Sequence, residues 1–309
     1  MAQRSGPGQA ALPRRGEMRR KNVRIAYLTI LPVIVILLAV KAYPIIATIY
    51  RSFTNWNGLY QNDFVGLANY KEFFGSGLFM VLFKNNLVLL LSVPLQVIIG
   101  LIVAVLLYEH VPGWKAFRAI YYIPQIISLV ILGYLFKSMF SLDGPVNQVL
   151  ESLGLGHLAK EWLADGSTAL PIMVGCITWY SIGWQTIVIL GGMSSIDPCV
   201  FEAARLDGAN FFQRTFKIVL PMITSVITYC IVMAVVWTFT SLFSLIYSMT
   251  GGGPGYETMT LDYMIYEKSF VTGSQLGMAC TISVVLFVII MIITAAEMKL
   301  SNMAEKKWG

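Results

Sequence analysis

Apolar segments long enough to cross a lipid bilayer recur along this chain of 309 residues. A helix needs about 20 apolar residues to cross about 30 Å of hydrocarbon. The composition agrees, because 57% of the residues are hydrophobic and only 12% are charged, whereas a soluble domain carries about 25% charged residues. We therefore expect an all-α integral membrane protein with six transmembrane helices, at 25–50, 78–108, 118–137, 169–191, 218–249 and 274–297.

The basic residues favour one orientation of these helices. If the N-terminus lies in the cytoplasm and the helices alternate in direction, the three outer loops together carry more acidic than basic residues. Because Lys and Arg are enriched in cytoplasmic loops, we expect both termini inside, in a multi-pass protein of a bacterial-type inner membrane. The basic residues on the cytoplasmic side are then Arg4, Arg14, Arg15, Arg19, Arg20, Lys21, Arg24, Lys115, Arg118, Arg205, Arg214, Lys217, Lys299, Lys306 and Lys307.

The N-terminal region has two interpretations. A basic stretch precedes the first apolar run, and Ala39-Val40-Lys41-Ala42 resembles a signal-peptidase site. The lysine is unfavourable there, however, and apolar residues continue to Tyr50, so we expect a retained helix. The Gly-, Pro- and Arg-rich composition of the first 20 or so residues indicates disorder. We expect 1–24 and 299–309 to be cytoplasmic tails and 51–77 to be an outer loop.

The sequence gives little support to enzymatic chemistry on this chain. Gly251–Gly255 lacks the lysine of a phosphate-binding loop, and neither G-x-S-x-G nor H-E-x-x-H occurs. His110 and His157 have no carboxylate or cysteine at metal-ligand spacing, so we expect no metal site. The net charge of +6 does not indicate a nucleic-acid partner, because the basic residues form no continuous face.

Acidic residues are almost absent from the middle of the predicted helices. Carriers driven by protons or sodium ions keep such groups near the membrane midplane. We therefore expect no cofactor on this chain and an energy source on another one. The alternative function, from a different class, is that of an integral-membrane enzyme or of a carrier that acts without partner subunits.

The loop between the fourth and fifth apolar segments, at about 195–221, predicts two short helices. Asp197 suits the N-cap and Pro198 the first helical position, while Gly208 suits the left-handed position after the helix. Phe211 to Leu220 predicts a second helix, and Pro221 marks the start of the fifth span. Such a loop fits a groove on a partner protein, although an amphipathic helix on lipid headgroups has the same pattern.

Glu202-Ala203-Ala204, then Gly208, then Ile218-Val219-Leu220-Pro221 reproduce every anchor of a known pattern. They resemble the EAA loop of ABC importer permeases: E-A-A, three residues, G, nine residues, I-x-L-P. The resemblance implies the type I ABC importer transmembrane fold, with a permease core over 78–298. Three further stretches are similar to the carbohydrate-uptake branch, related to the maltose and glycerol-phosphate permeases: 64–70, 117–124 and 250–255 with Thr258 and Tyr266. The short 51–77 loop departs from the maltose permease, since it leaves no room for a large outer domain.

The resemblance also implies partners. They are a second homologous permease subunit, two ABC ATPase subunits that hold ATP and Mg²⁺, and an extracytoplasmic solute-binding protein. Glu202 would contact the ATPase, Gly208 would permit the bend, and Ala203 and Ala204 would allow close docking. The complete set of coupling residues is Glu202, Ala203, Ala204, Arg205, Asp207, Gly208 and Pro221. The outer loop Gly251, Gly252, Gly253, Pro254 and Gly255 would lie where the binding protein docks, although an ordinary turn explains it equally well.

A sugar substrate presents hydroxyl groups and an apolar ring face, so we expect amides, hydroxyls and aromatic rings along its path. The fourth and fifth spans supply Tyr180, Trp184, Gln185, Trp237, Ser241 and Tyr247. Gln185 is the strongest candidate, because a polar group in an apolar span needs a partner or a cavity. The alternative substrate is a non-sugar solute carried by the same machinery, such as glycerol phosphate, a peptide or an amino acid.

Overall fold

The computed structural model describes residues 15–109 and 113–308. Arg4 and Arg14, which were predicted to lie in the N-terminal tail, are outside the described residues. So is His110, which was considered as a metal ligand. Within the described ranges the regular structure is helical, apart from one isolated β-bridge between Thr54 and Phe64. The prediction of an all-α chain is confirmed.

Contacts divide the chain into two units, residues 1–50 and 51–309. The first unit contains α1 (Arg15–Leu37), a π-helical turn (Leu38–Ala42) and α2 (Tyr43–Arg51) except for its last residue, Arg51, which belongs to the second unit. Because α1 begins at Arg15, the disorder expected over the first 20 or so residues is wrong for 15–20. The apolar side chains of this span are exposed within the unit, as suits a helix whose surroundings are lipid.

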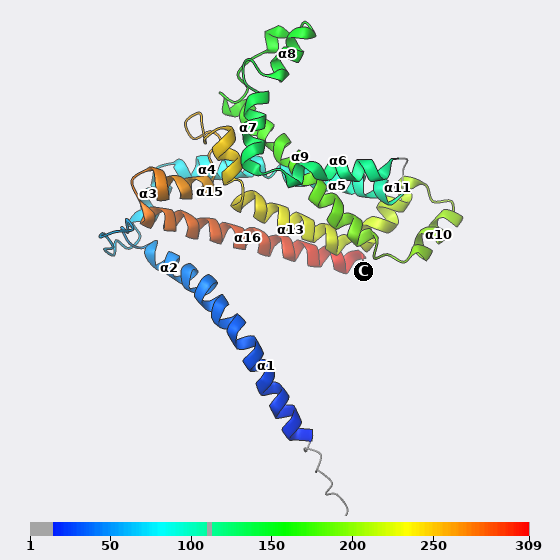
Figure 1. The fold of residues 1–309 in the computed structure, drawn as a ribbon, viewed down its shortest axis with the longest axis horizontal. Coiled ribbons are helices and arrows are strands. Elements are labelled where there is room, and N and C mark those ends of the chain that lie inside the picture. The colour runs from blue at the N-terminus through cyan, green and yellow to red at the C-terminus, as the bar shows by residue number, and fades with distance from the viewer. Residues whose placement is uncertain (1–14, 110–112, 309) are drawn as a thin grey trace, which may run out of the picture. The chain divides into compact units, whose positions relative to one another are not determined.

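The second unit holds the remaining helices (Figure 1). In chain order they are α3 (Ala68–Gly75), α4 (Leu78–Leu89), α5 (Ser92–Tyr108), α6 (Trp114–Ile126), α7 (Leu129–Met139), α8 (Pro145–Ser152), η2 (Gly156–Leu158), α9 (Gly166–Met193), α10 (Pro198–Leu206), α11 (Phe211–Arg214), η3 (Thr215–Val219), α12 (Leu220–Met222), α13 (Thr224–Thr240), α14 (Phe243–Met249), α15 (Leu261–Tyr266), η4 (Glu267–Val271) and α16 (Leu276–Trp308).

Four helical stretches of the described chain are long and apolar enough to cross a membrane: 26–51, 78–108, 166–193 and 276–301. Two bent helix pairs raise the total to six if each pair is one span. Where the sequence predicted one span at 118–137, α6 and α7 meet at 98°, with Ile127 and Ser128 extended between them. The second pair, 211–222 and 224–240, bends by 75°. Helix α16 continues to Trp308, so the predicted tail at 299–309 is helical as far as that residue.

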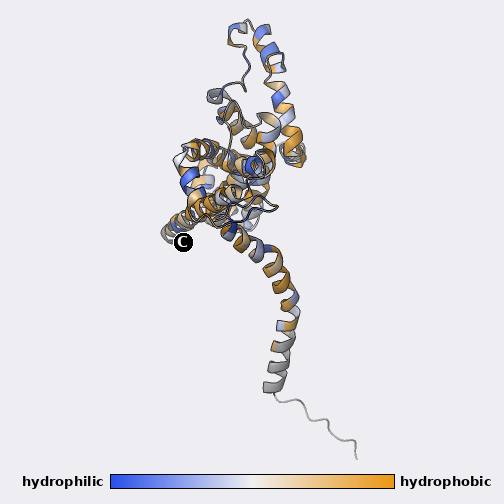
Figure 2. Ribbon diagram, turned by 90° about the vertical axis from the view of Figure 1, so that its left-hand side faces the viewer, coloured by the Kyte–Doolittle hydropathy of each residue, from blue (hydrophilic) through white to orange (hydrophobic). Residues whose placement is uncertain are grey.

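The bundle of the second unit is built around α5 and α9, which pack along each other, and around α13 and α16 (Figure 1). Its main core includes Leu89, Met173, Ile177, Phe239 and Ile282, all completely buried. Figure 2 shows hydrophobic residues along the bundle helices and hydrophilic residues gathered around α8, which extends from the end of α7. This distribution suits bundle helices in a membrane and an α8 region outside it.

Helix α4 anchors the loop before α15 through two buried asparagines. Asn85 Nδ2 donates to the carbonyl oxygens of Tyr256 and Met259, both at 2.8 Å. Asn86 Oδ1 accepts from the Leu261 backbone N–H at 3.1 Å. Polar groups of an irregular loop are thereby satisfied beside an apolar core, as buried backbone groups must be. The loop is held to the helices that form the core.

Candidate functional site

Helix α10 has the local structure that its sequence predicts. The Asp197 carboxylate accepts a hydrogen bond from the Cys199 backbone N–H at 2.9 Å, and Pro198 occupies the first helical position. This hydrogen bond holds the pKa of Asp197 below its usual range, so the cap weakens only as the pH falls through that lowered pKa. Gly208 follows the helix with φ +77°, a conformation that other residues adopt only with strain.

The two faces of α10 differ in exposure. Phe201 and Ala204 are buried, and the Phe201 ring lies 4.9 Å from that of Tyr108 at the end of α5. Glu202 and Ala203 are exposed, and Leu206 keeps 88% of its surface. Ala203 and Ala204 therefore do not form one outward surface, because Ala204 packs on its own bundle. The exposed surface of α10 includes Glu202, Ala203 and Leu206.

The second half of the loop is helical but not regular. Asn210 caps α11 through a reciprocal pair of hydrogen bonds, from Gln213 N to Asn210 Oδ1 at 2.8 Å and from Asn210 N to Gln213 Oε1 at 2.9 Å. A π-helical turn, 215–219, interrupts the continuous helix that the sequence predicts over 211–220. Pro221 lies in α12, just before the 75° bend.

Replacing Asn210 by Ala should destabilise this segment by about 1 kcal/mol, because the Gln213 backbone N–H loses the side-chain oxygen that accepts its hydrogen bond. Faster hydrogen–deuterium exchange over 210–219 measures the effect. Asn62→Ala is the control, since Asn62 is exposed in the loop between α2 and α3, far from 210–219 in the sequence. Unchanged exchange at 210–219 would show that the capping box does not stabilise the segment.

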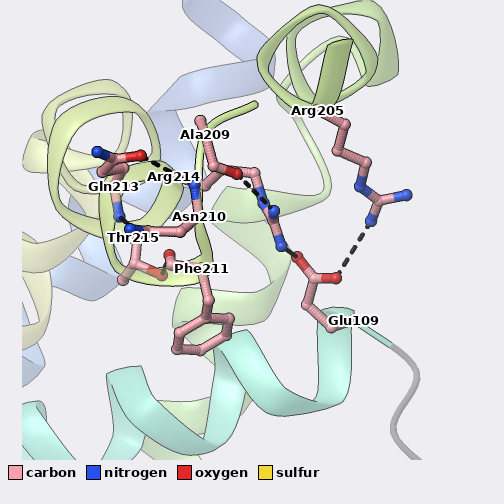
Figure 3. A network of polar contacts seen from close by, with 8 residues as sticks. All are labelled: Glu109, Arg205, Ala209, Asn210, Phe211, Gln213, Arg214 and Thr215. Carbon is pink, nitrogen blue, oxygen red and sulfur yellow. Dashed lines mark hydrogen bonds and ion pairs between the residues drawn. The ribbon is translucent and has the colours of Figure 1, made fainter. Parts of the chain in front are cut away.

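Glu109, the residue after α5, joins the two halves of the loop (Figure 3). Its Oε2 lies 3.1 Å from Arg205 Nη2 and its Oε1 lies 2.9 Å from Arg214 Nη2. Arg214 also donates from Nη1 to the Ala209 carbonyl at 3.0 Å. The Arg214 side chain is 16% exposed and the Arg205 side chain 58% exposed. Glu109 had no predicted role, although it is an acidic residue that ends an apolar span on the side predicted to hold both arginines.

A cavity of about 190 Å³ lies where α5, α6, α9 and α13 meet. Gln185 on α9 is completely buried, and its Nε2 donates to Gln96 Oε1 on α5 at 3.3 Å. Buried amide atoms remain without a hydrogen-bond partner here: Gln96 Nε2, Gln125 Oε1 and Gln185 Oε1. The rings of Tyr180 and Trp237 stack with centroids 5.8 Å apart. The cavity is lined by Gln96, Gln125, Tyr180, Ser181, Trp184, Gln185, Met233, Ala234 and Trp237.

The structure therefore brings four of the six predicted path residues together: Tyr180, Trp184, Gln185 and Trp237. Ser241 and Tyr247 do not line the cavity. Ser241 follows the end of α13, and Tyr247 on α14 belongs to a separate aromatic group with Phe243 and Tyr266, at 5.8 and 5.9 Å. The glutamines of α5 and α6, Gln96 and Gln125, were not predicted. A polar amide in an apolar run was the signal that marked Gln185, and it applies equally to Gln96.

The glycine-rich loop at 251–255 is a structured turn. Gly251, Gly252 and Gly255 have positive φ, and the Thr258 hydroxyl donates to Thr250 Oγ1 and to the Gly253 carbonyl, both at 2.8 Å. Gly252 is buried, whereas Gly251, Pro254 and Gly255 are exposed. The exposed three are the part of the predicted docking loop that a partner can touch.

Glu257, directly after this turn, accepts from the Gly166 N–H at the start of α9 at 2.8 Å. Asp165 caps the same helix, accepting from Ser167 N at 2.8 Å, and the hydrogen bonds from Ser167 lower the pKa of Asp165. Across 15–109 and 113–308, no three His, Cys, Asp or Glu side chains lie close enough together to hold a metal ion. The glycine-rich turn is thus held against the N-terminus of α9, the helix that lines the cavity.

Two relatives cover most of the chain. It is 33% identical over 287 residues to the probable ABC transporter permease protein YurN of Bacillus subtilis, covering 91% of this chain and 97% of that protein. It is also 33% identical over 265 residues to the multiple sugar-binding transport system permease protein MsmF of Streptococcus mutans, covering 85% of this chain and 90% of the relative.

Solved structures share the fold. A chain of a bacterial ABC transporter that imports the acidic polysaccharide alginate superposes with a TM-score of 0.80 at 25% identity, covering 94% of this chain and 99% of that one. A bacterial alginate ABC transporter in complex with an alginate pentasaccharide-bound periplasmic protein gives 0.78 at 25% identity, covering 93% and 96%. These matches confirm the type I importer fold predicted from the sequence.

The matched region includes both sites described above. A family model for the inner membrane component of binding-protein-dependent transport systems matches residues 87–301, which contain the cavity, Glu109 and α10. Its members are transport subunits and not enzymes. This chain belongs to the family of binding-protein-dependent transport system inner membrane components and is the permease subunit of an ABC importer.

Proposed function

We propose that this permease imports a sugar or oligosaccharide and that its cavity is part of the path. The cavity is the observation that supports this proposal. Its unpartnered amide atoms can form hydrogen bonds with sugar hydroxyls, and Tyr180 and Trp237 can pack on an apolar ring face. Two of the similar proteins, from Streptococcus mutans and in the alginate importer, are named for sugar and polysaccharide transport. The residues that line the cavity within the described chain are uncharged. A phosphate ester or a zwitterionic amino acid needs charged partners, so the lining favours a neutral sugar.

We propose that α10 is the contact to the ATPase subunits, which would hold ATP and Mg²⁺. Glu202, Ala203 and Leu206 present a charge, a small side chain and an apolar side chain to one partner. Partner grooves accept such a helix through its exposed face. Gly208 lets α10 and the following helix run in different directions, because its positive φ turns the chain.

We propose a second, homologous permease as the other half of the path and an extracytoplasmic binding protein as the source of substrate. The periplasmic protein in the alginate complex supports the latter partner. Gly251, Pro254 and Gly255 are exposed next to the N-terminus of α9, which suits a docking surface for that protein.

We propose that both termini and α10 lie in the cytoplasm and that the α8 region lies outside. The basic residues around 205–217 and at the termini support this orientation. The 138–168 segment, which includes α8, carries more acidic than basic residues.

The test is the ATPase activity of the reconstituted complex with its binding protein and a panel of solutes. Neutral mono- and oligosaccharides, uronic acid oligosaccharides, glycerol phosphate and a peptide are compared. We expect stimulation by a neutral sugar. Stimulation by uronates alone would contradict the inference that the uncharged lining selects a neutral sugar. Stimulation by glycerol phosphate or the peptide alone would overturn the sugar assignment.

A further inference from the structure

Glu109 makes a tight connection between one bundle helix and both halves of the loop. Its backbone N–H donates to the Val105 carbonyl at 3.0 Å, so the residue is held at the end of α5. The two carboxylate oxygens reach different arginines, on either side of the turn at Gly208 (Figure 3). We define the Glu109 clamp as Glu109, Arg205 and Arg214.

The same helix reaches the cavity at its other end. Gln96 on α5 accepts the hydrogen bond from Gln185, and Glu109 lies 13 residues later, or about 20 Å along a helix. Between these points α5 lies close against α9, since a Cβ on Gly100 would come within 2.7 Å of Gln185 Cβ. We therefore expect a displacement of the clamp to move α5, the helix that carries the cavity residue Gln96.

The Glu109 clamp is better suited than an exposed surface ion pair to transmit movement between helices. Both contacts are hydrogen-bonded ion pairs, which are stronger than neutral hydrogen bonds. Arg214 is largely buried, so loss of the carboxylate would leave a poorly solvated cation. An exposed pair alone would contribute little, because water and salt screen it. The buried arm fixes α11 to α5, and the exposed arm ties α10 to the same carboxylate.

We propose that Glu109 is the positioning residue that makes α10, α11 and α5 move together, so that ATPase-driven displacement of α10 reaches the cavity through α5. This inference rests on the proposed ATPase contact at α10. It predicts a specific defect: without the clamp, the ATPases still assemble and hydrolyse ATP, but hydrolysis no longer moves substrate efficiently.

The test replaces Glu109 by Gln in the full complex, reconstituted with its ATPases, binding protein and a transported sugar. We expect the number of sugar molecules transported per ATP hydrolysed to fall about fivefold or more, the range of typical coupling energies. A purely structural role would lower transport and ATPase activity together and leave this ratio unchanged. Glu151→Gln is the matched control, because Glu151 is exposed on α8 and forms no ion pair within the described part of the chain.

A charge exchange tests the pair directly. E109R combined with R214E should recover part of the ratio that E109R alone loses, since one arm of the clamp is restored with reversed polarity. If E109Q does not reach the membrane, E109D takes its place, because a shorter carboxylate keeps the charge but cannot span both arginines. An unchanged ratio in the variant that reaches the membrane would overturn the inference.

A cross-link separates this inference from the proposed function. Ala203→Cys on the exposed face of α10 should cross-link to an ATPase subunit carrying an engineered cysteine. If the cross-link forms and E109Q couples normally, the clamp has no transmitting role while the ATPase contact stands. If no cysteine position on the ATPase cross-links to α10, the proposed contact itself fails, and the clamp inference fails with it.

Discussion

Sugar uptake is expected to fall about 30-fold or more when Glu202 is replaced by Lys and Gly208 by Asp. The first change reverses a charge at the centre of the proposed ATPase contact, where removing a paired charge costs about 2–5 kcal/mol. The second forces a side chain into a φ of +77°, at a cost of about 1–2 kcal/mol. The protein should still reach the membrane, because Glu202 is exposed and an added Cβ at Gly208 meets no other atom within 4 Å.

The chain contains a matched control for this double variant. Glu151 lies exposed on α8, and Gly154 follows that helix with φ +75° and equally open surroundings. Glu151→Lys with Gly154→Asp therefore makes the same chemical change at a helix end away from α10. Uptake by cells and substrate-stimulated ATPase activity are measured for both variants. Normal uptake with normal ATPase stimulation in the 202/208 variant would contradict the coupling role of α10.

Gln185→Leu is expected to lower sugar transport about tenfold at limiting substrate. Leu retains much of the volume of Gln but provides no hydrogen-bonding group, and it leaves the Gln96 amide without its partner. Loss of hydrogen bonds from a buried polar group costs about 1–3 kcal/mol, which corresponds to about this factor. Basal ATPase activity should persist, because no residue of α10 lines the cavity.

Thr178→Val is the control for the cavity variant. Thr178 is buried on the same helix, and its hydroxyl donates to the Val174 carbonyl at 2.7 Å, not into the cavity. Transport assays at several substrate concentrations distinguish a change in apparent affinity from a loss of protein. Wild-type transport by Gln185→Leu would show that the sugar path does not use this amide.

Local chemistry allowed the loop to be predicted in detail. Asp197, Pro198 and Gly208 act within a few residues of their own position, so the start and end of α10 follow from the sequence. The same reasoning did not reveal that Ala204 faces inward. Its orientation depends on Phe201 packing against Tyr108, a residue almost a hundred positions earlier.

Tertiary contacts explain the remaining differences between the sequence predictions and the structure. The Glu109 clamp and the Gln96–Gln185 hydrogen bond join residues 89 to 105 positions apart, which periodicity along one helix does not reveal. Ser241 and Tyr247 were included because one helix was expected over 218–249. Since α13 ends at Thr240, the helical phase is lost there, and these residues leave the face that carries Trp237. The break between α6 and α7 was missed for a similar reason, because the apolar run continues through it.

ATP-driven sugar accumulation in proteoliposomes tests directly whether this permease imports a sugar. The complex is reconstituted with its ATPases, ATP is supplied on their side, and the binding protein with labelled sugar is supplied on the other side. We predict accumulation above the external concentration that requires both ATP and the binding protein. Equilibration of the sugar without ATP, or ATP hydrolysis with no sugar movement by the wild-type complex, would contradict ATP-driven sugar import by this permease.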